Sequence, residues 1–278
     1  MRKLKSILFF SLCSIATIIS ISALIFIISI VFLKGVAAIH VGFLTQEMVE
    51  GGQKGGIIYQ ICGTMILMAA AMIISFPISL CASVYYTEFL KPTLKRSTIV
   101  LIYALNGVPA ILFGLFGYII FGIYFGWGTS WLTGSFVLAI MVLPILFINI
   151  TRAIESIPVK YRQSALALGF TKWQLIHSVL IPQSFFGIVT GLLLGLSRIV
   201  GVTSAIMFTA TTFSGGRIPL TFREPVATLQ THIMILSQET VNPLSRTNAW
   251  GATLVLLTIV LIFHGASMYV RMKTSSEV

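Results

Sequence analysis

The chain has 278 residues, of which 57% are hydrophobic and 9% are charged, and its mean hydropathy is +1.01. This composition excludes a soluble globular domain and indicates a protein of the lipid bilayer. The net charge of +11 would favour nucleic acid as the partner of a soluble domain. Here the positive charges follow a membrane topology instead, so we expect no nucleic-acid partner.

Six apolar stretches can cross a membrane, because one span needs about 20 mostly apolar residues. We therefore predict an all-α membrane protein with six transmembrane helices. The first stretch follows basic residues but is longer than the roughly 7 to 15 apolar residues of a signal-peptide core, so we interpret it as an uncleaved helix. The predicted spans are residues 7–33, 57–84, 98–125, 134–151, 185–210 and 249–270.

Two parts are predicted from these spans. Residues 1–56 form an N-terminal transmembrane helix and an outer loop, and residues 57–278 form a transmembrane domain with a charged elbow at 152–183. With the N-terminus inside, 12 Lys and Arg residues fall on the inner side and 5 on the outer side, which leaves Arg198 within a span. The excess predicts that both termini and the elbow face the cytoplasm.

Prolines interrupt the spans at Pro77, Pro109 and Pro144. Each removes a helical hydrogen-bond donor and crowds the preceding turn. The sharpest break is the run from Asn106 to Pro109. Neighbouring helices or water in a cavity must satisfy the freed backbone groups, so we interpret Asn106 and Pro109 as a bend that lines a pathway. A kink that only shapes the packing is the alternative.

The fifth span carries Gly187, Gly191 and Gly195, a spacing that permits close approach between membrane helices. At about 100° per residue, Arg198 lies near the same stripe. We therefore expect the arginine to point into a helix interface, with Ala205 and Thr209 continuing the stripe. Its guanidinium suits the oxygens of an anion. The alternative is neutralisation by backbone carbonyls or by a partner subunit.

The sequence of the elbow predicts two short helices. Pro158 suits a helix start, and Gly169 suits a helix end. Thr171 and Gln174 have the spacing of a capping box that starts the second helix, with Trp173, Ile176 and Leu180 on its apolar face. This unit can dock into a partner's groove, or it can lie on the membrane surface as an interfacial elbow.

The run from Ala165 to Gly169, with Pro182 closing the unit, resembles the cytoplasmic coupling loop of permease subunits in binding-protein-dependent ABC importers. Four further segments resemble the phosphate-importer branch, particularly its second permease subunit: Gly63-Thr64, residues 108–118, Leu143-Pro144 and residues 198–203. The similar region covers about residues 55–210.

This resemblance implies a type I ABC importer permease fold with a cytoplasmic coupling helix, in the bacterial plasma (inner) membrane. It implies a second homologous permease, two cytoplasmic ATPases and an extracytoplasmic phosphate-binding protein as partners. ATP would be used by the ATPases, so this chain would bind no cofactor. The residues implied for ATPase coupling are Arg162, Gln163, Ser164, Ala165, Leu168, Gly169 and Trp173. The residues that we predict for the substrate pathway are Asn106, Pro109, Arg198 and Thr203.

The chain departs from this pattern at two positions. Gln163 and Val202 stand where the family usually has glutamate. The alternative function is an ion-coupled secondary carrier for an anion, but such carriers ordinarily have an acid or relay histidine in mid-membrane, and only His264 lies in a span. The four histidines and three cysteines lack metal-ligand spacing, and no nucleophile–base or paired-carboxylate arrangement is present. We therefore predict neither a metal site nor an enzyme.

Overall fold

The computed structural model describes residues 2–52, 54–212, 217–239 and 242–275. Two short strands, β1 (Met48–Val49) and β2 (Lys54–Gly55), form an antiparallel pair beside the 3-10 turn η1 (Glu50–Gly52). The remaining elements are helical. They are α1 (Arg2–Val36), α2 (Val41–Thr45), α3 (Ile58–Glu88), α4 (Pro92–Asn106), α5 (Ala110–Gly117), π-helix η2 (Tyr118–Tyr124), α6 (Trp131–Glu155), α7 (Val159–Ala167), α8 (Lys172–Leu175), π-helix η3 (Ile176–Leu180), α9 (Ile181–Val200), α10 (Ser204–Thr209), α11 (Leu229–Gln238) and α12 (Pro243–Ser275).

Five of the six predicted spans correspond to long apolar helices, and the third, 98–125, corresponds to a pair of helices joined at a sharp bend. Among the described residues, five helical segments are long and apolar enough to cross a membrane: 9–36, 58–88, 131–155, 172–200 and 243–273. This pair is α4 and residues 110–124, which meet at an angle of 89°, and it brings the number of spans to six when it is counted as one. The bend falls between Asn106 and Ala110, where the sequence places Gly107 and Pro109.

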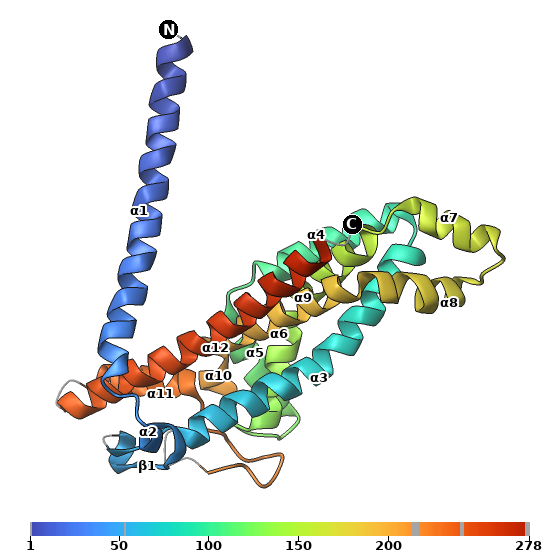
Figure 1. Cartoon of the computed structure of the whole chain (residues 1–278). Coiled ribbons are helices and arrows are strands. Elements are labelled where there is room, and N and C mark those ends of the chain that lie inside the picture. The colour runs from blue at the N-terminus through green and yellow to red at the C-terminus, as the bar shows by residue number, and fades with distance from the viewer. Residues whose placement is uncertain (1, 53, 213–216, 240–241, 276–278) are drawn as a thin grey trace.

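Helix α6 is the centre of the bundle. Its face packs against α3 and α9, and Leu138, Leu146 and Ile150 are completely buried. Helix α12 lies along the outside of α9, so four spans surround a shared apolar core (Figure 1). Helices α7 and α8 project at one end of this bundle, and α2, β1 and α11 lie at the other end. The C-terminal end of α12 is on the side of α7 and α8.

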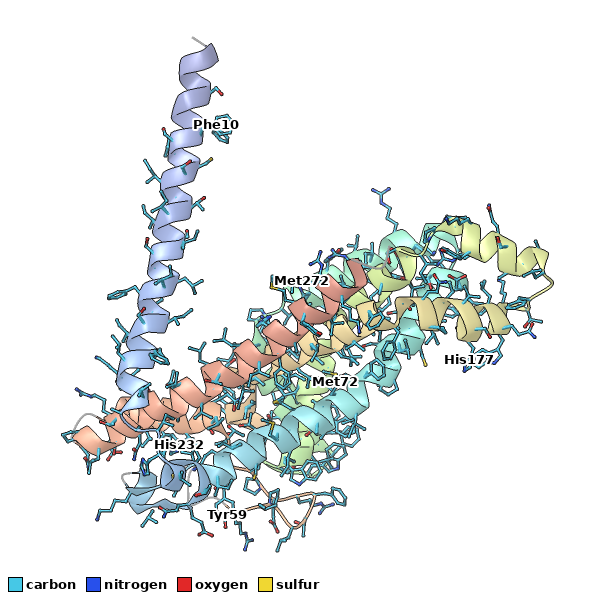
Figure 2. All side chains as sticks on the ribbon, in the orientation of Figure 1. Phe10, Tyr59, Met72, His177, His232 and Met272 are labelled. Atoms are coloured by element: carbon cyan, nitrogen blue, oxygen red, sulfur yellow. The ribbon has the colours of Figure 1, made fainter. Side chains whose placement is uncertain are left out.

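Only the C-terminal end of helix α1 contacts α12, and the rest of α1 points away from the bundle (Figure 1). The ammonium of Lys34 lies 5.0 Å from the ring centroid of Trp250, and a Cβ on Gly35 would be 2.7 Å from Cβ of Leu254. Most of α1 further toward the N-terminus exposes apolar side chains, and Figure 2 shows Phe10 with no other helix beside it. This surface belongs against lipid or another membrane protein.

The fifth span differs from the predicted range 185–210. The apolar helical segment begins at Lys172, and its helix ends at Val200, so α10 is a separate helix. The side chain of Gln230 donates a hydrogen bond to the carbonyl of Val200 at 2.8 Å, which satisfies a carbonyl group at the helix end. Ala205 and Thr209 therefore do not continue the glycine stripe, and that part of the prediction is wrong.

Candidate functional site

The three glycines of α9 lie against α6. A Cβ on Gly187 would be 2.5 Å from Cβ of Ala153, and one on Gly191 would be 3.0 Å from Cβ of Asn149. A Cβ on Gly195 would be 2.8 Å from Cδ2 of Leu146. The two helices thus approach so closely that no other residue fits at these positions without movement.

Arg198 lies beside this interface and not within it, so the expectation that it points into a helix interface is wrong. Its side chain is exposed and opens into a hollow of about 380 Å³. Ile145 of α6, His264 of α12 and Val202, which follows α9, contribute to the wall. The full lining is Ile145, Leu194, Ser197, Arg198, Gly201, Val202 and His264.

Arg198 brings a positive charge to the hollow, and none of the residues that line it is acidic. Arg198 makes no hydrogen bond or ion pair with any residue that the structure describes. Ser197 is buried, and its hydroxyl donates to the carbonyl of Leu194 at 3.0 Å. A guanidinium in such a place is available to an anion or to the carbonyl groups of another subunit.

The other predicted pathway residues are not brought together with Arg198. Thr203 lines a second hollow, of about 450 Å³, with Ile111 of α5 and Gln230 of α11. Asn106 and Pro109 are exposed at the bend between α4 and α5. The four residues therefore do not form one continuous site in this structure.

A buried polar cluster holds α3, α9 and α11 together beside the second hollow. The hydroxyl of Thr64 accepts a hydrogen bond from the backbone N–H of Leu229 at 3.0 Å and donates to Oε1 of Gln230 at 3.3 Å. Gln230 also binds the end of α9. Sequence analysis missed Gln230 as a lining residue, since nothing in the local pattern indicates a contact across 166 positions.

The elbow of residues 152–183 has the two caps that its sequence predicts. Gly169 ends the first helix in a left-handed conformation with φ +81°, which favours glycine. The hydroxyl of Thr171 accepts from the backbone N–H of Gln174 at 3.3 Å, and Oε1 of Gln174 accepts from the backbone N–H of Thr171 at 2.8 Å. This capping box starts α8 directly after the turn.

The tip of the elbow exposes two large apolar side chains. Leu168 is 77% exposed and Trp173 is 73% exposed, on either side of Gly169. Trp173 therefore does not share the buried face of Ile176 and Leu180, contrary to the prediction. Gln163, Ser164 and Lys172 are also exposed, whereas Ala165 is buried in the core. An exposed apolar patch with a polar rim is typical of a protein interaction site.

Arg162 is placed differently from the exposed residues of the elbow. Its guanidinium turns toward the bundle, where it forms an ion pair of 3.1 Å with Glu88 at the end of α3. The elbow thus combines an exposed tip with an inward-facing cation.

At the opposite end of the molecule, Glu224 and His232 have shifted pKa values. Glu224 accepts hydrogen bonds from the backbone N–H of Leu220 and the hydroxyl of Thr221, at 3.0 and 3.2 Å, and the Leu220 bond is the main cause of its lowered pKa. Burial in α11 lowers the pKa of His232 to about 4. This histidine lies near α2 (Figure 2), and it is neutral at physiological pH.

Residues 80–273 match the family described as binding-protein-dependent transport system inner membrane component. The chain belongs to this family. Among its relatives, a probable ABC transporter permease protein, YqgI of Bacillus subtilis (strain 168), is 30% identical over 94% of this chain and 92% of the relative. The phosphate transport system permease protein PstA of Pasteurella multocida (strain Pm70) is 28% identical over 98% of this chain and 97% of the relative.

A further relative, the probable phosphate transport system permease protein PstA of Methanocaldococcus jannaschii, is 31% identical over 94% of this chain and 91% of the relative. Solved transporters share the fold at lower identity. The MetNI methionine ABC transporter gives a TM-score of 0.59 at 16% identity, over 78% of this chain and 94% of that chain. A bacterial alginate ABC transporter gives 0.60 at 17%, over 85% of each chain.

These comparisons confirm an all-α, multi-pass membrane protein with the type I ABC importer permease fold. The relatives are permeases of ABC transport systems, and none of those described here supports the secondary-carrier alternative.

Proposed function

We propose that this chain is the permease subunit of an ATP-driven phosphate importer and forms the translocation pathway with a second, homologous permease. The observation that carries the proposal is the acid-free hollow with the unpaired guanidinium of Arg198, in a chain whose relatives include phosphate permeases. His264 adds a second nitrogen-bearing side chain to the same hollow.

The position of Arg198 supports contact with a passing anion. Arg198 lies in the last turn of the apolar segment 172–200. A charged arginine within a span costs up to about 2.5 to 3.5 kcal/mol on insertion scales, and no acid lines the hollow to offset this cost. The hollow opens on the surface of the chain, where a second permease would close it. Phosphate oxygens suit the planar fork of guanidinium donors.

The elbow supports an ATPase as cytoplasmic partner. Its exposed tip of Leu168, Gly169 and Trp173 would sit in a groove of the ATPase, with the polar side chains of Gln163 and Ser164 nearby. In this proposal the chain itself is not catalytic and binds no cofactor, because ATP is hydrolysed by the partner. Both termini then lie in the cytoplasm with the elbow, and an extracytoplasmic phosphate-binding protein delivers the substrate.

The test uses the complex of this chain with the permease, ATPase and binding protein that co-purify with it, reconstituted in liposomes. ATP-dependent uptake of labelled phosphate is expected for the wild type. Arg198→Gln should lower uptake roughly tenfold to a hundredfold, since it removes a charge-assisted contact, whereas Arg271→Gln, the same change at the exposed end of α12, should not.

Two results would contradict this proposal. Normal phosphate uptake by Arg198→Gln would exclude the contact with the anion. Rapid uptake by the purified chain alone, driven by a pH gradient without ATPase, would support the carrier.

A further inference from the structure

Basic side chains from three other elements contact the C-terminal end of α3, which is the cytoplasmic end in the proposed topology. Lys95 of α4 donates a hydrogen bond to the carbonyl of Thr87 at 2.9 Å. The ammonium of Lys172, in α8, lies 5.0 Å from the ring centroid of Phe89, and Arg162 of α7 pairs with Glu88. Cations are favourable here because the C-terminal end of a helix carries partial negative charge.

Arg162 is the one of these side chains that joins two spans. One Nη2 atom lies 3.1 Å from Oε1 of Glu88 and donates to the carbonyl of Ile154 at 3.2 Å. Glu88 is the last residue of α3, and Ile154 lies in the last turn of α6. The elbow helix α7 is therefore attached to the ends of both spans by a single guanidinium.

Arg162 is much less exposed to solvent than the residues at the tip of the elbow. Its side chain is 21% exposed and that of Glu88 is 14% exposed, against 73% for Trp173. Water and salt therefore screen the Arg162–Glu88 ion pair much less than they screen an ion pair on the surface. The other inward-facing residue of α7, Ala165, is buried in the core but has no polar group with which to bind the ends of α3 and α6.

We infer that Arg162 is a positioning residue that passes movement of the elbow to α3 and α6 through Glu88 and the carbonyl of Ile154. This inference rests on the proposed function, in which the ATPase displaces the elbow. It assigns Arg162, which the family resemblance places in the coupling of the ATPase, a role within this chain, through Glu88 and Ile154. Rotation of a docked short helix then changes the positions of two spans together.

The experiment uses the reconstituted complex with its ATPase, second permease and binding protein. Arg162→Gln and Glu88→Gln should each leave the amount of co-purified ATPase unchanged. Phosphate taken up per ATP hydrolysed should fall roughly threefold to thirtyfold, the range in which residues between coupled sites alter coupling. Lys160→Gln, the same loss of charge on the exposed side of α7, is the matched control and should change neither quantity.

Two further variants test the geometry. The double variant Glu88→Arg with Arg162→Glu restores an ion pair without the bond to Ile154, so uptake per ATP should recover in part. Arg162→Lys keeps the charge but lacks the guanidinium fork, so its uptake per ATP should be intermediate between that of the wild type and that of Arg162→Gln.

The inference is overturned if Arg162→Gln loses the ATPase while Glu88→Gln keeps it, because Arg162 would then be a partner contact. It is also overturned if both variants transport normally per ATP. Absence of ATP-dependent phosphate uptake in the wild-type complex would instead contradict the proposed function, so the two failures are distinguishable.

Discussion

The elbow and the Arg198 end of α9 acquire their structures in different ways. In the elbow, Gly169 and the pair Thr171 and Gln174 set the turn and the helix start, and the paired residues are three positions apart. At the end of α9, the helix stops where Gln230, 30 positions away, binds its last carbonyl. Local signals therefore determine the shape of the elbow, whereas distant helices determine where Arg198 points.

The first way to test this difference is to disturb the packing of α9 against α6, a contact between helices that are separate in the sequence. Gly187→Leu should destabilise the chain by about 3 kcal/mol, because a well-packed interface tolerates extra methylenes poorly and a Cβ here would already lie 2.5 Å from that of Ala153. Gly265→Leu is the matched control, since no atom lies within 4 Å of its Cβ position. The measurement is the free energy of unfolding in mixed micelles, and equal losses in both variants would contradict the close packing.

A second long-range test uses pH. The pKa of His232 is about 4 in the folded chain and 6.5 when unperturbed, so on acidification the unfolded state takes up the proton first. The stabilisation is complete above about pH 6.5 and declines as the pH falls toward 4, with a loss on the order of 2 kcal/mol at pH 5. His232→Gln should remove this part of the pH dependence, whereas His177→Gln, an exposed site, should retain it. Identical pH profiles of unfolding for the two variants would show that His232 does not cause this pH dependence.

A substitution at Gly169 tests whether neighbouring residues determine the shape of the elbow. Its φ of +81° disfavours any residue with a Cβ, although no atom lies within 4 Å of that position, so Gly169→Val should cost about 1 to 2 kcal/mol. Gly126→Val meets the same restriction, with φ +70° and open space, outside the elbow. Both variants should lose stability, but only Gly169→Val should reduce phosphate uptake per ATP in the reconstituted complex. A similar reduction by both would show that the elbow has no special role.

The smallest effect is expected at Thr171. Thr171→Ala removes the side chain that accepts from the backbone N–H of Gln174, and loss of such a cap costs about 1 kcal/mol. Thr171→Ser keeps the hydroxyl and should retain most of the stability. Thermal unfolding of the purified chain measures both, and a larger loss in Thr171→Ser would show that the methyl group matters more than the cap.

The sequence predicts the spans and the elbow well for the same physical reason. Span length and caps depend on neighbouring residues, so they can be read from short segments such as 169–174. The direction of Arg198 cannot be read this way. A regular helix places it near the glycine stripe, but Ile145 and His264 form the hollow from two other helices. The inward turn of Arg162 cannot be read from the local sequence either, because it depends on where α3 and α6 end.

The open side of the Arg198 hollow has a consequence for biogenesis. A newly inserted subunit without its companion presents a charged guanidinium toward acyl chains, which is unfavourable for an isolated protein in lipid. Assembly that covers this group stabilises the folded chain by mass action. Orphan copies should accordingly be cleared by membrane proteases faster than assembled ones, which would keep the stoichiometry of the transporter balanced.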